Sequence, residues 1–224
     1  MGMYKHPSSR PDDAASPPAT LMETAFRVFA ERGYRATRLD EVAEAAGVTK
    51  GAIYYYFESK EDLLRKAVHH RHRAIFAEIA EALRSERAPA SARIRLTLRK
   101  IWAHWLDPGW GHALRLMLGE VSLEFPALFR MWAEAGPIHG WSLVRDLVEE
   151  GQRSGEFRRD ADAEVAARIV VSGLMLQAGL HVHMGLADLA PCDTDRIFDS
   201  AVDVFLRGLA VTALPPSGGE APRA

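Results

Sequence analysis

The chain has 224 residues, of which 48% are hydrophobic, and its 28 Lys and Arg residues against 30 Asp and Glu residues give a formal net charge of -2. This length allows a substantial core in one or two domains. The balanced charge excludes a globally basic protein that attracts nucleic acid over its whole surface, so such a partner would need a local patch. The single cysteine, Cys192, excludes an internal disulfide and a metal cage of cysteine thiolates.

The two ends of the chain differ in composition from its middle. Residues 1–18 contain four prolines and few large apolar side chains, and residues 215–224 are similar, so we expect a disordered arm and a disordered tail. The arm lacks the apolar stretch of a secretory signal, and three polar residues interrupt the most apolar internal stretch, Val165 to Leu180. These features predict a cytoplasmic protein without a membrane anchor.

Apolar residues recur at helical spacing almost everywhere from Ala19 onward, and no segment combines period-two alternation with hairpin turn residues. The sequence therefore predicts an all-α fold. The expected helices, in chain order, are one that ends at Gly33, then Arg38 to Ala45, Lys50 to Phe57, Lys60 to about Ser85, Ala90 to Leu106, Trp110 to Glu124, Ala127 to Gln152 with a break or kink at Gly136-Pro137, Asp162 to Met184, and Thr194 to Ala213. The helices lengthen after residue 60, which indicates a small domain over 19–66 and a larger helical domain over 67–214.

The segment from Thr37 to Phe57 has the pattern of a helix-turn-helix. Thr37 and Asp40 are three residues apart, as in a capping box at the start of the first helix, and Thr49 suits the N-cap of the second. Gly47 lies between the two helices, where a tight turn often needs a positive φ. Ser59 and Asp62 suit a further capping box, which starts the next helix at Lys60.

The second helix of this motif has an apolar and a polar side. Ile53 and Phe57 are four residues apart, so they lie on one face and are expected to pack on Val42 and Ala43. The opposite side is open to a partner, and it carries Val48, Thr49, Lys50, Gly51, Tyr54 and Tyr55. Tyrosine hydroxyls donate to phosphates, and a lysine and a glycine at the helix start leave room for base edges. The pattern predicts a recognition helix that enters the major groove of DNA.

These residues resemble the DNA-binding domain of the TetR family of bacterial regulators, over roughly residues 20–68. The matching positions are Ala36-Thr37, Val42-Ala43, Ala45 to Thr49, Gly51, Ile53-Tyr54, Tyr56-Phe57, Ser59-Lys60 and Leu63. The resemblance implies phosphate contacts from Thr37, Thr49, Tyr54, Tyr56 and Lys60, and positions near the bases for Lys50, Gly51 and Tyr55. Arg38 departs from the small hydroxyl residue common in the family, and a phosphate contact and a minor-groove contact both remain open for it.

A single recognition helix contacts too few base pairs for useful specificity, so proteins of this kind present two through a two-fold dimer. Two apolar seams at helical spacing are the candidate dimer surface, and they consist of Val165, Ile169, Gly173 and Leu176 in one helix and Ile197, Ala201, Val204, Phe205 and Gly208 in the last. The resemblance implies that these helices form a four-helix bundle with their copies. The alternative is that both seams are internal core.

All five tryptophans fall between positions 102 and 141, and this concentration favours a ligand cavity, because small-molecule sites are mostly apolar with few polar anchors. The candidate lining residues are Trp102, Trp105, Met117, Phe129, Trp132, Met175 and Gln177. The alternative is ordinary core packing. By the family resemblance, a small and largely apolar effector would bind there and, through the helix from Lys60 to Ser85, change the spacing of the two DNA-binding heads.

Two other functional classes are weighed against a DNA-binding regulator. An enzyme is disfavoured: Glu120 and Glu124 have the spacing of paired carboxylates, but no histidine follows a glutamate by three positions as a di-iron bundle requires. His181 and His183 diverge on a helix, so we expect no metal and no cofactor. The remaining alternative is a helical adaptor or a small-molecule-binding protein that binds no operator. We expect a homodimeric repressor whose partners are duplex operator DNA and an effector.

Overall fold

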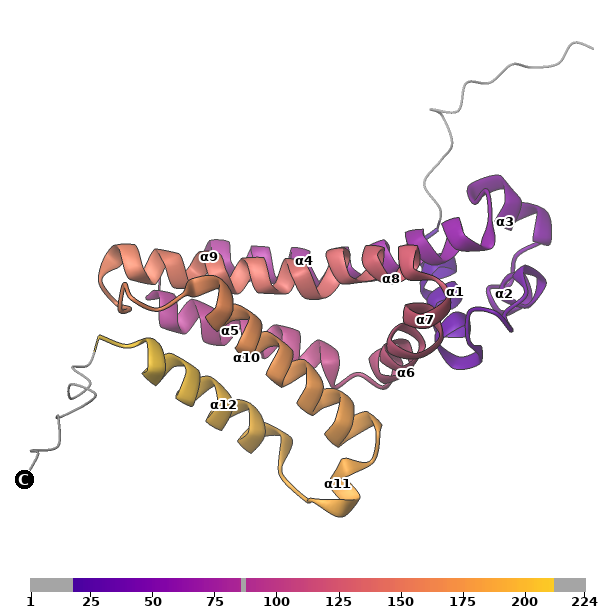
Figure 1. The fold of residues 1–224 in the computed structure, drawn as a ribbon. Coiled ribbons are helices and arrows are strands. Elements are labelled where there is room, and N and C mark those ends of the chain that lie inside the picture. The colour runs from indigo at the N-terminus through magenta and orange to yellow at the C-terminus, as the bar shows by residue number, and fades with distance from the viewer. Residues whose placement is uncertain (1–17, 86–87, 212–224) are drawn as a thin grey trace, which may run out of the picture. The chain divides into compact units, whose positions relative to one another are not determined.

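The computed structural model describes residues 18–85 and 88–211, so the predicted arm, apart from Pro18, and the predicted tail lie outside the described residues. Within these ranges the regular structure is helical, apart from one isolated β-bridge between Phe157 and Ala210. The predicted all-α fold is confirmed (Figure 1).

The helices follow the predicted order along the chain. They are α1 (Ala19–Arg32), α2 (Leu39–Ala45), α3 (Lys50–Tyr56), α4 (Lys60–Ser85), α5 (Ala90–Trp105), α6 (Pro108–Leu116), α7 (Ser122–Glu124), α8 (Pro126–Ala133), α9 (His139–Ser154), α10 (Ala163–Gln177), α11 (Leu186–Leu189) and α12 (Thr194–Leu209). The π-helical segments η2 (Met117–Val121), η3 (Glu134–Ile138) and η4 (Ala178–His183) continue α6, α8 and α10. The one-turn helix α11 was not predicted, because four residues carry no periodic signal.

Two prolines influence where the helices begin or are interrupted. Helix α6 begins at Pro108, two residues earlier than predicted, because proline suits the first turn of a helix and the Asp107 carboxylate accepts a hydrogen bond from the Gly109 N–H at 2.9 Å. Pro137 was expected to mark a break or kink. The α-helix is interrupted at this point by the π-helical segment η3, whose wider turn accommodates a residue that lacks an N–H.

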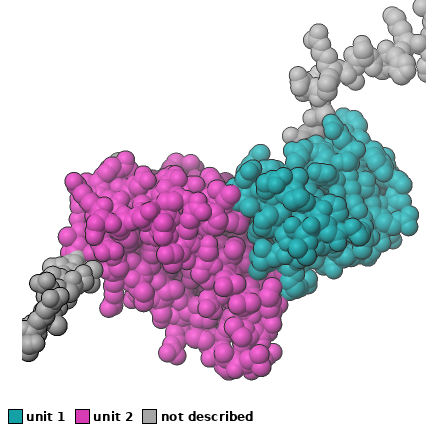
Figure 2. All heavy atoms as spheres, viewed as in Figure 1, with its two compact units in different colours: residues 1–74, 112–135 teal, residues 75–111, 136–224 magenta. Residues whose placement is uncertain are grey.

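The chain forms two compact units (Figure 2). Unit 1 runs up to Ala74 and includes His112–Ala135, and unit 2 contains Ile75–Gly111 and the chain from Gly136 onward. Within α4 the division between the two units falls between Ala74 and Ile75, and the division into domains 19–66 and 67–214 stays a prediction. The sequence pattern gave no sign that residues 112–135 join the N-terminal helices, because that association depends on contacts between distant segments.

The core of unit 1 forms on the buried faces of its helices. Phe29 of α1, Ile53 of α3 and Leu64 of α4 are fully buried. Tyr34, in the loop between α1 and α2, lies against Phe29 with ring centroids 5.8 Å apart and against Phe125 at 4.7 Å in an edge-on arrangement. Phe29 of α1 and Phe125, between α7 and α8, therefore belong to the same core through Tyr34.

The core of unit 2 forms where α10 packs against α5, α9 and α12. Ion pairs reinforce the α5–α12 contact: Arg99 of α5 reaches Asp195 and Asp199 of α12, each at 2.7 Å, and Arg95 pairs with Asp203. These three aspartates are spaced four residues apart, so they lie on one face of α12, and this face contacts α5.

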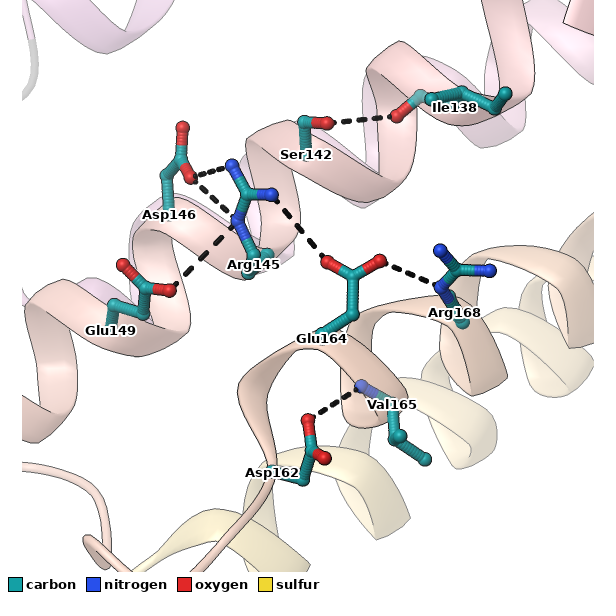
Figure 3. Close-up of polar contacts among 9 residues, drawn as sticks. All are labelled: Ile138, Ser142, Arg145, Asp146, Glu149, Asp162, Glu164, Val165 and Arg168. Atoms are coloured by element: carbon teal, nitrogen blue, oxygen red, sulfur yellow. Dashed lines mark hydrogen bonds and ion pairs between the residues drawn. The ribbon is translucent and has the colours of Figure 1, made fainter.

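A polar network joins the outer surfaces of α9 and α10 (Figure 3). Arg145 of α9 contacts Asp146 at 2.6 Å and Glu164 of α10 at 3.5 Å, and Glu164 also accepts from Arg168 at 2.7 Å. Asp162 caps α10 by accepting a hydrogen bond from the Val165 N–H at 3.0 Å. These contacts fix the start of α10 against α9.

Helix α5 begins without a local cap, because Pro89 at its N-cap has no side-chain acceptor. The Glu156 carboxylate supplies one from a distant part of the sequence: it accepts hydrogen bonds from the Ala90 N–H at 2.7 Å and the Ser91 N–H at 3.0 Å. A carboxylate at a helix N-terminus is further favoured by the helix dipole.

We expect Glu156→Gln to lower the free energy of unfolding by about 1–3 kcal/mol, because one of the two N–H groups then faces an amide donor instead of an acceptor. Urea denaturation measures the effect. The matched control is Glu149→Gln on the exposed side of α9, where we expect a change within about 0.5 kcal/mol. Equal stabilities of the two variants would contradict this role.

Candidate nucleic-acid interface

Helices α2 and α3 form the helix-turn-helix that the sequence predicts. The turn contains Gly47 with φ +67°, the positive value expected there. Thr49 caps α3, and its hydroxyl oxygen accepts a hydrogen bond from the Ala52 N–H at 3.2 Å. Both features depend on neighbouring residues alone, which is why the sequence predicts them.

The two sides of α3 differ as predicted. Ile53 is fully buried and Phe57 is 2% exposed, and Val42 and Ala43 of α2 are buried with them. The opposite side is accessible: Tyr54 is 54% exposed and Tyr55 64%, and Lys50, Gly51 and Thr49 are exposed, whereas Val48 and Tyr56 are half-buried. A Cβ built on Gly51 would meet only the Thr49 hydroxyl, at 3.8 Å, so the backbone is open to close approach at this point.

The predicted capping box of Thr37 and Asp40 is wrong. Helix α2 begins at Leu39 with Arg38 as its N-cap, and the Glu41 carboxylate accepts a hydrogen bond from the Arg38 N–H at 2.9 Å. The Thr37 side chain is 2% exposed, and its hydroxyl donates to the Gly33 carbonyl at 2.7 Å. A side chain turned inward in this way offers little surface to a phosphate, which argues against the expected contact of Thr37.

Lys60 also has a role that the sequence did not reveal. Its ammonium group donates to the carbonyls of Tyr34, Arg35 and Thr37 at 2.9, 3.3 and 3.2 Å, and it lies 4.6 Å from the centre of the Tyr34 ring. These contacts use its donors inside unit 1. Lys60 therefore has a structural role in the loop before α2, and this role competes with the phosphate contact that was expected of it.

The start of α4 is capped by neighbouring residues. The Ser59 hydroxyl accepts from the Asp62 N–H at 3.1 Å, as predicted, but the Asp62 carboxylate accepts from the Glu58 N–H at 3.2 Å rather than from Ser59. Burial alone would raise the pKa of Asp62, but hydrogen bonds from Lys66, the Glu58 N–H and Arg65 outweigh burial and leave that pKa below its ordinary value.

The exposed cations of the motif are few. Arg38 is accessible at the start of α2, with its side chain 77% exposed. Lys50 forms an ion pair with Asp40, with 2.8 Å between Nζ and Oδ1, and donates a hydrogen bond to Oδ2 at 3.1 Å. This hydrogen bond raises the pKa of Lys50. The motif therefore presents tyrosine hydroxyls and two exposed cations to a partner, and both cations lie near the Asp40 carboxylate, Lys50 at 2.8 Å and Arg38 at 4.0 Å.

The candidate ligand residues are divided between the units. Trp102, Trp105, Met175 and Gln177 belong to unit 2, and Met117, Phe129 and Trp132 belong to unit 1. Both tryptophans of α5 are buried, whereas Gln177 is exposed. Trp102 stacks near Phe198 with 6.1 Å between ring centroids, and Trp105 lies 5.8 Å from Trp110. In unit 1, Phe129 and Trp132 lie 5.7 Å apart on α8.

The two apolar seams of unit 2 face away from its core. On α10 the exposed fractions are 48% for Val165, 68% for Ile169 and 55% for Leu176, and on α12 Val204 is 74% exposed. The other candidate interface residues are also accessible: Gly173 and Gly208 are exposed, and Ile197, Ala201 and Phe205 are half-buried. The opposite faces carry buried residues, so the seams are not part of the core of this unit.

The apolar character of α10 has a second possible meaning. By length and composition, residues Ala163–His183 would suffice to cross a membrane. In the fold α10 packs against α5, α9 and α12, and Ala167, Val170, Val171 and Leu174 are buried there. It is a core helix with one apolar face left over.

Comparison with known proteins assigns both parts of the chain. Residues 21–67 match the model of bacterial regulatory proteins of the TetR family, and residues 92–209 match the model of the AefR-like transcriptional repressor C-terminal domain. The chain belongs to the TetR family. This TetR-family protein is a transcriptional regulator and not an enzyme.

Two transcriptional regulators are similar to this chain over about two thirds of its length, at less than 30% sequence identity. The chain is 29% identical over 154 residues to the HTH-type transcriptional repressor KstR2 of Rhodococcus jostii, covering 67% of this chain and 72% of that protein. It is 26% identical over 152 residues to the fatty acid metabolism regulator protein of Bacillus subtilis, covering 67% and 75%. These matches support the assignment of the chain to ligand-responsive regulators.

Solved structures share the fold of this TetR-family regulator. The regulator FadR from Bacillus subtilis, solved with stearoyl-CoA, superposes with a TM-score of 0.68 at 22% identity over 85% of this chain and 98% of that one. A regulator from Saccharomonospora viridis, solved with choline, gives a TM-score of 0.70 at 22% identity over 86% and 97%. The two bound molecules differ greatly in size and polarity, so the fold itself does not identify an effector.

Sequence reasoning missed the partners of one carboxylate. Glu120 was noted for its spacing from Glu124, but its carboxylate accepts hydrogen bonds from the backbone N–H groups of Tyr34 and Arg35, and Glu124 pairs with the Arg35 side chain. The spacing of the two glutamates was a signal that both face one side. Nothing local indicated that this side contains the loop before α2, which lies 86 residues earlier in the chain.

The different roles of Arg38 and Lys60 predict different salt effects. We expect Arg38→Ala to reduce the slope of log affinity for DNA against log salt by about one unit, because one exposed cation is lost from the DNA-binding side. Lys60→Ala should leave this slope unchanged and lower the midpoint of thermal unfolding, because three loop carbonyls lose their donor. Fluorescence anisotropy over a salt series and thermal melting make the measurements. A reduced slope in Lys60→Ala would restore it as a phosphate contact.

Proposed function

We propose that this TetR-family regulator is a cytoplasmic repressor that binds a palindromic operator as a homodimer and is released by a small, largely apolar molecule. The observation that carries the proposal is the two-sided character of α3. Ile53 anchors the helix in the core of unit 1, while Lys50, Tyr54 and Tyr55 stand exposed on the other side. A short helix held by its apolar side and bare on its polar side suits insertion into the major groove.

The chemistry of the exposed side favours contacts to phosphate and base edges together. The hydroxyls of Tyr54 and Tyr55 suit phosphate oxygens, and the open backbone at Gly51 leaves space for Lys50 to reach a base. Lys50 would exchange its ion pair with Asp40 for a contact to DNA. This exchange leaves the number of charge contacts of Lys50 unchanged. We therefore expect the sequence specificity of DNA binding to come largely from shape complementarity and hydrogen bonds.

The second element of the proposal is the homodimer. A two-fold partner would cover the stripe of Val165, Ile169 and Leu176 on α10 together with Val204 on α12, which water otherwise contacts. The glycines of both stripes favour close helix approach, because a Cβ built on Gly173 or Gly208 meets nothing within 4 Å inside the protomer.

We expect Ile169→Lys combined with Val204→Lys to raise the dimer dissociation constant by about 100-fold or more, because the four lysines of a dimer would be brought together in an apolar interface. Analytical ultracentrifugation measures this constant, and operator affinity should fall with it. The control is Arg196→Ala, an exposed residue of α12 outside the stripe. A double variant that remains as dimeric as the wild type would exclude this surface.

The DNA-binding proposal is tested by selecting bound fragments from a genomic library. We expect a palindromic duplex, and Lys50→Ala with Tyr55→Ala should weaken its binding at least tenfold while Arg27→Ala, an exposed cation of α1, leaves it unchanged. Selection of no sequence by a folded, dimeric protein would favour the alternative, a helical adaptor or small-molecule-binding protein that binds no operator.

The effector part of the proposal rests on the apolar interior of unit 2. Among the described residues, the Thr97 hydroxyl and the Trp102 indole N–H of α5 are buried without a hydrogen-bond partner. Buried donors of this kind suit a ligand that brings an acceptor into an otherwise apolar site. Helix α4, which contributes residues to both units, is the proposed route by which binding changes the spacing of the DNA-binding heads.

The FadR structure contains stearoyl-CoA, so a long acyl chain is the apolar group to test first in an effector. We expect stearoyl-CoA to weaken operator binding at least tenfold in an anisotropy titration, because an effector must prefer the form that does not bind DNA. Acetyl-CoA is the matched control, since it carries the same CoA group without the long chain. Tight binding of stearoyl-CoA with unchanged operator affinity would exclude it as the effector.

A further inference from the structure

We propose that Glu120 is a positioning residue for operator binding: from outside the helix-turn-helix, its carboxylate holds the loop before α2 in the conformation that binds DNA. This inference rests on the proposed function of the helix-turn-helix. It assigns to residues 112–135, which join unit 1, a direct part in setting DNA affinity.

The two oxygens of Glu120 take up two successive backbone donors. Oε2 lies 3.0 Å from the Tyr34 N–H nitrogen and Oε1 lies 2.7 Å from that of Arg35. Hydrogen bonds from backbone N–H groups to a charged carboxylate are stronger than those between neutral groups. One side chain therefore fixes two adjacent peptide groups in one orientation.

The backbone at Gly33 is shaped for this carboxylate. Gly33 has φ +88°, a value that favours glycine, and a Cβ at this position would lie 2.8 Å from Oε2 of Glu120. Any side chain at residue 33 would push the carboxylate out of place. The glycine that ends α1 thus also opens the space into which Glu120 fits.

Lys60 holds the opposite set of groups in the same loop. Its ammonium group donates to the carbonyls of Tyr34, Arg35 and Thr37, while the N–H groups of Tyr34 and Arg35 donate to Glu120. An anion on one set and a cation on the other leave the loop little freedom to rotate its peptide planes. The loop leads directly to Arg38, the N-cap of α2, so its conformation sets where α2 begins.

Neighbouring side chains keep Glu120 in this place. It lies in η2, where Met117 and Val121 are fully buried, and Phe125 packs edge-on against Tyr34. Glu124 pairs with the exposed side chain of Arg35, so it holds the outside of the loop without contacting the backbone. Glu124 therefore provides a matched control for Glu120: same residue type, same segment, same loop, but no backbone contact.

The experiment compares Glu120→Gln, Glu120→Ala and Glu124→Gln in the full-length protein, on the operator selected for the wild type. We expect both Glu120 variants to raise the Kd for operator about tenfold, with an unchanged salt slope, because Glu120 contacts no DNA. Hydrogen exchange at the Tyr34 and Arg35 amides should be at least tenfold faster in both. Glu124→Gln should retain wild-type exchange at these two amides and a Kd within about twofold.

The direction of the change in Kd for operator distinguishes a positioning role of Glu120 from a purely electrostatic one. Removing a carboxylate near DNA without a positioning role would strengthen binding, because it removes repulsion from phosphate. Titration with excess operator gives the fraction of active protein, so that Kd refers to folded molecules only. Unchanged or tighter operator binding by Glu120→Gln, or wild-type exchange at the two amides, would overturn the proposal while the DNA-binding function stands. A folded wild type that binds no duplex would overturn both.

Discussion

The helix-turn-helix depends on the hydrogen-bond partners of the six-residue loop between α1 and α2. Residues 33–38 belong to no helix, so most of their N–H and C=O groups need partners from elsewhere. Glu120 accepts from two of the N–H groups, Lys60 donates to three of the carbonyls, and the Thr37 hydroxyl donates to the Gly33 carbonyl. With these groups paired, α2 has a defined starting point, and α3 follows from it through a turn that Gly47 allows.

The same physical device appears in unit 2. Glu156 accepts from the N–H groups of Ala90 and Ser91, just as Glu120 accepts from those of Tyr34 and Arg35. In each case a carboxylate from far along the chain accepts hydrogen bonds from two successive backbone N–H groups, at the start of α5 or in the loop that leads into α2. Since the partner residues are 65 to 86 positions apart, each contact forms only when the unit is folded. Such contacts couple the start of a helix to the tertiary structure of its unit.

This distance also explains what could be predicted from the sequence. The helices, the positive φ of Gly47, the cap at Thr49 and the buried side of α3 follow from residues within one or two turns of each other, and these predictions are confirmed. Thr37 and Lys60 carry the right chemistry for phosphate, but contacts with the loop turn them inward. Glu120 was noted for its spacing from Glu124, yet its partners could not be identified. The extent of unit 1 beyond Ala74 depends on the same kind of long-range contact.

The paired state of the cations has a consequence for how tightly one head can bind DNA. Lys60 is occupied within the loop and Lys50 is paired with Asp40 at 2.8 Å. Arg38 is the more weakly held exposed cation of the motif, because its guanidinium lies 4.0 Å from the Asp40 carboxylate. A head with few free charges gains little from counterion release, and its affinity rests on hydrogen bonds that need an accurately placed helix. Accurate placement is what the contacts of Glu120 and Lys60 provide. A second head, brought in through the exposed stripes of α10 and α12, would then double a modest but well-defined contact rather than add to a large electrostatic one.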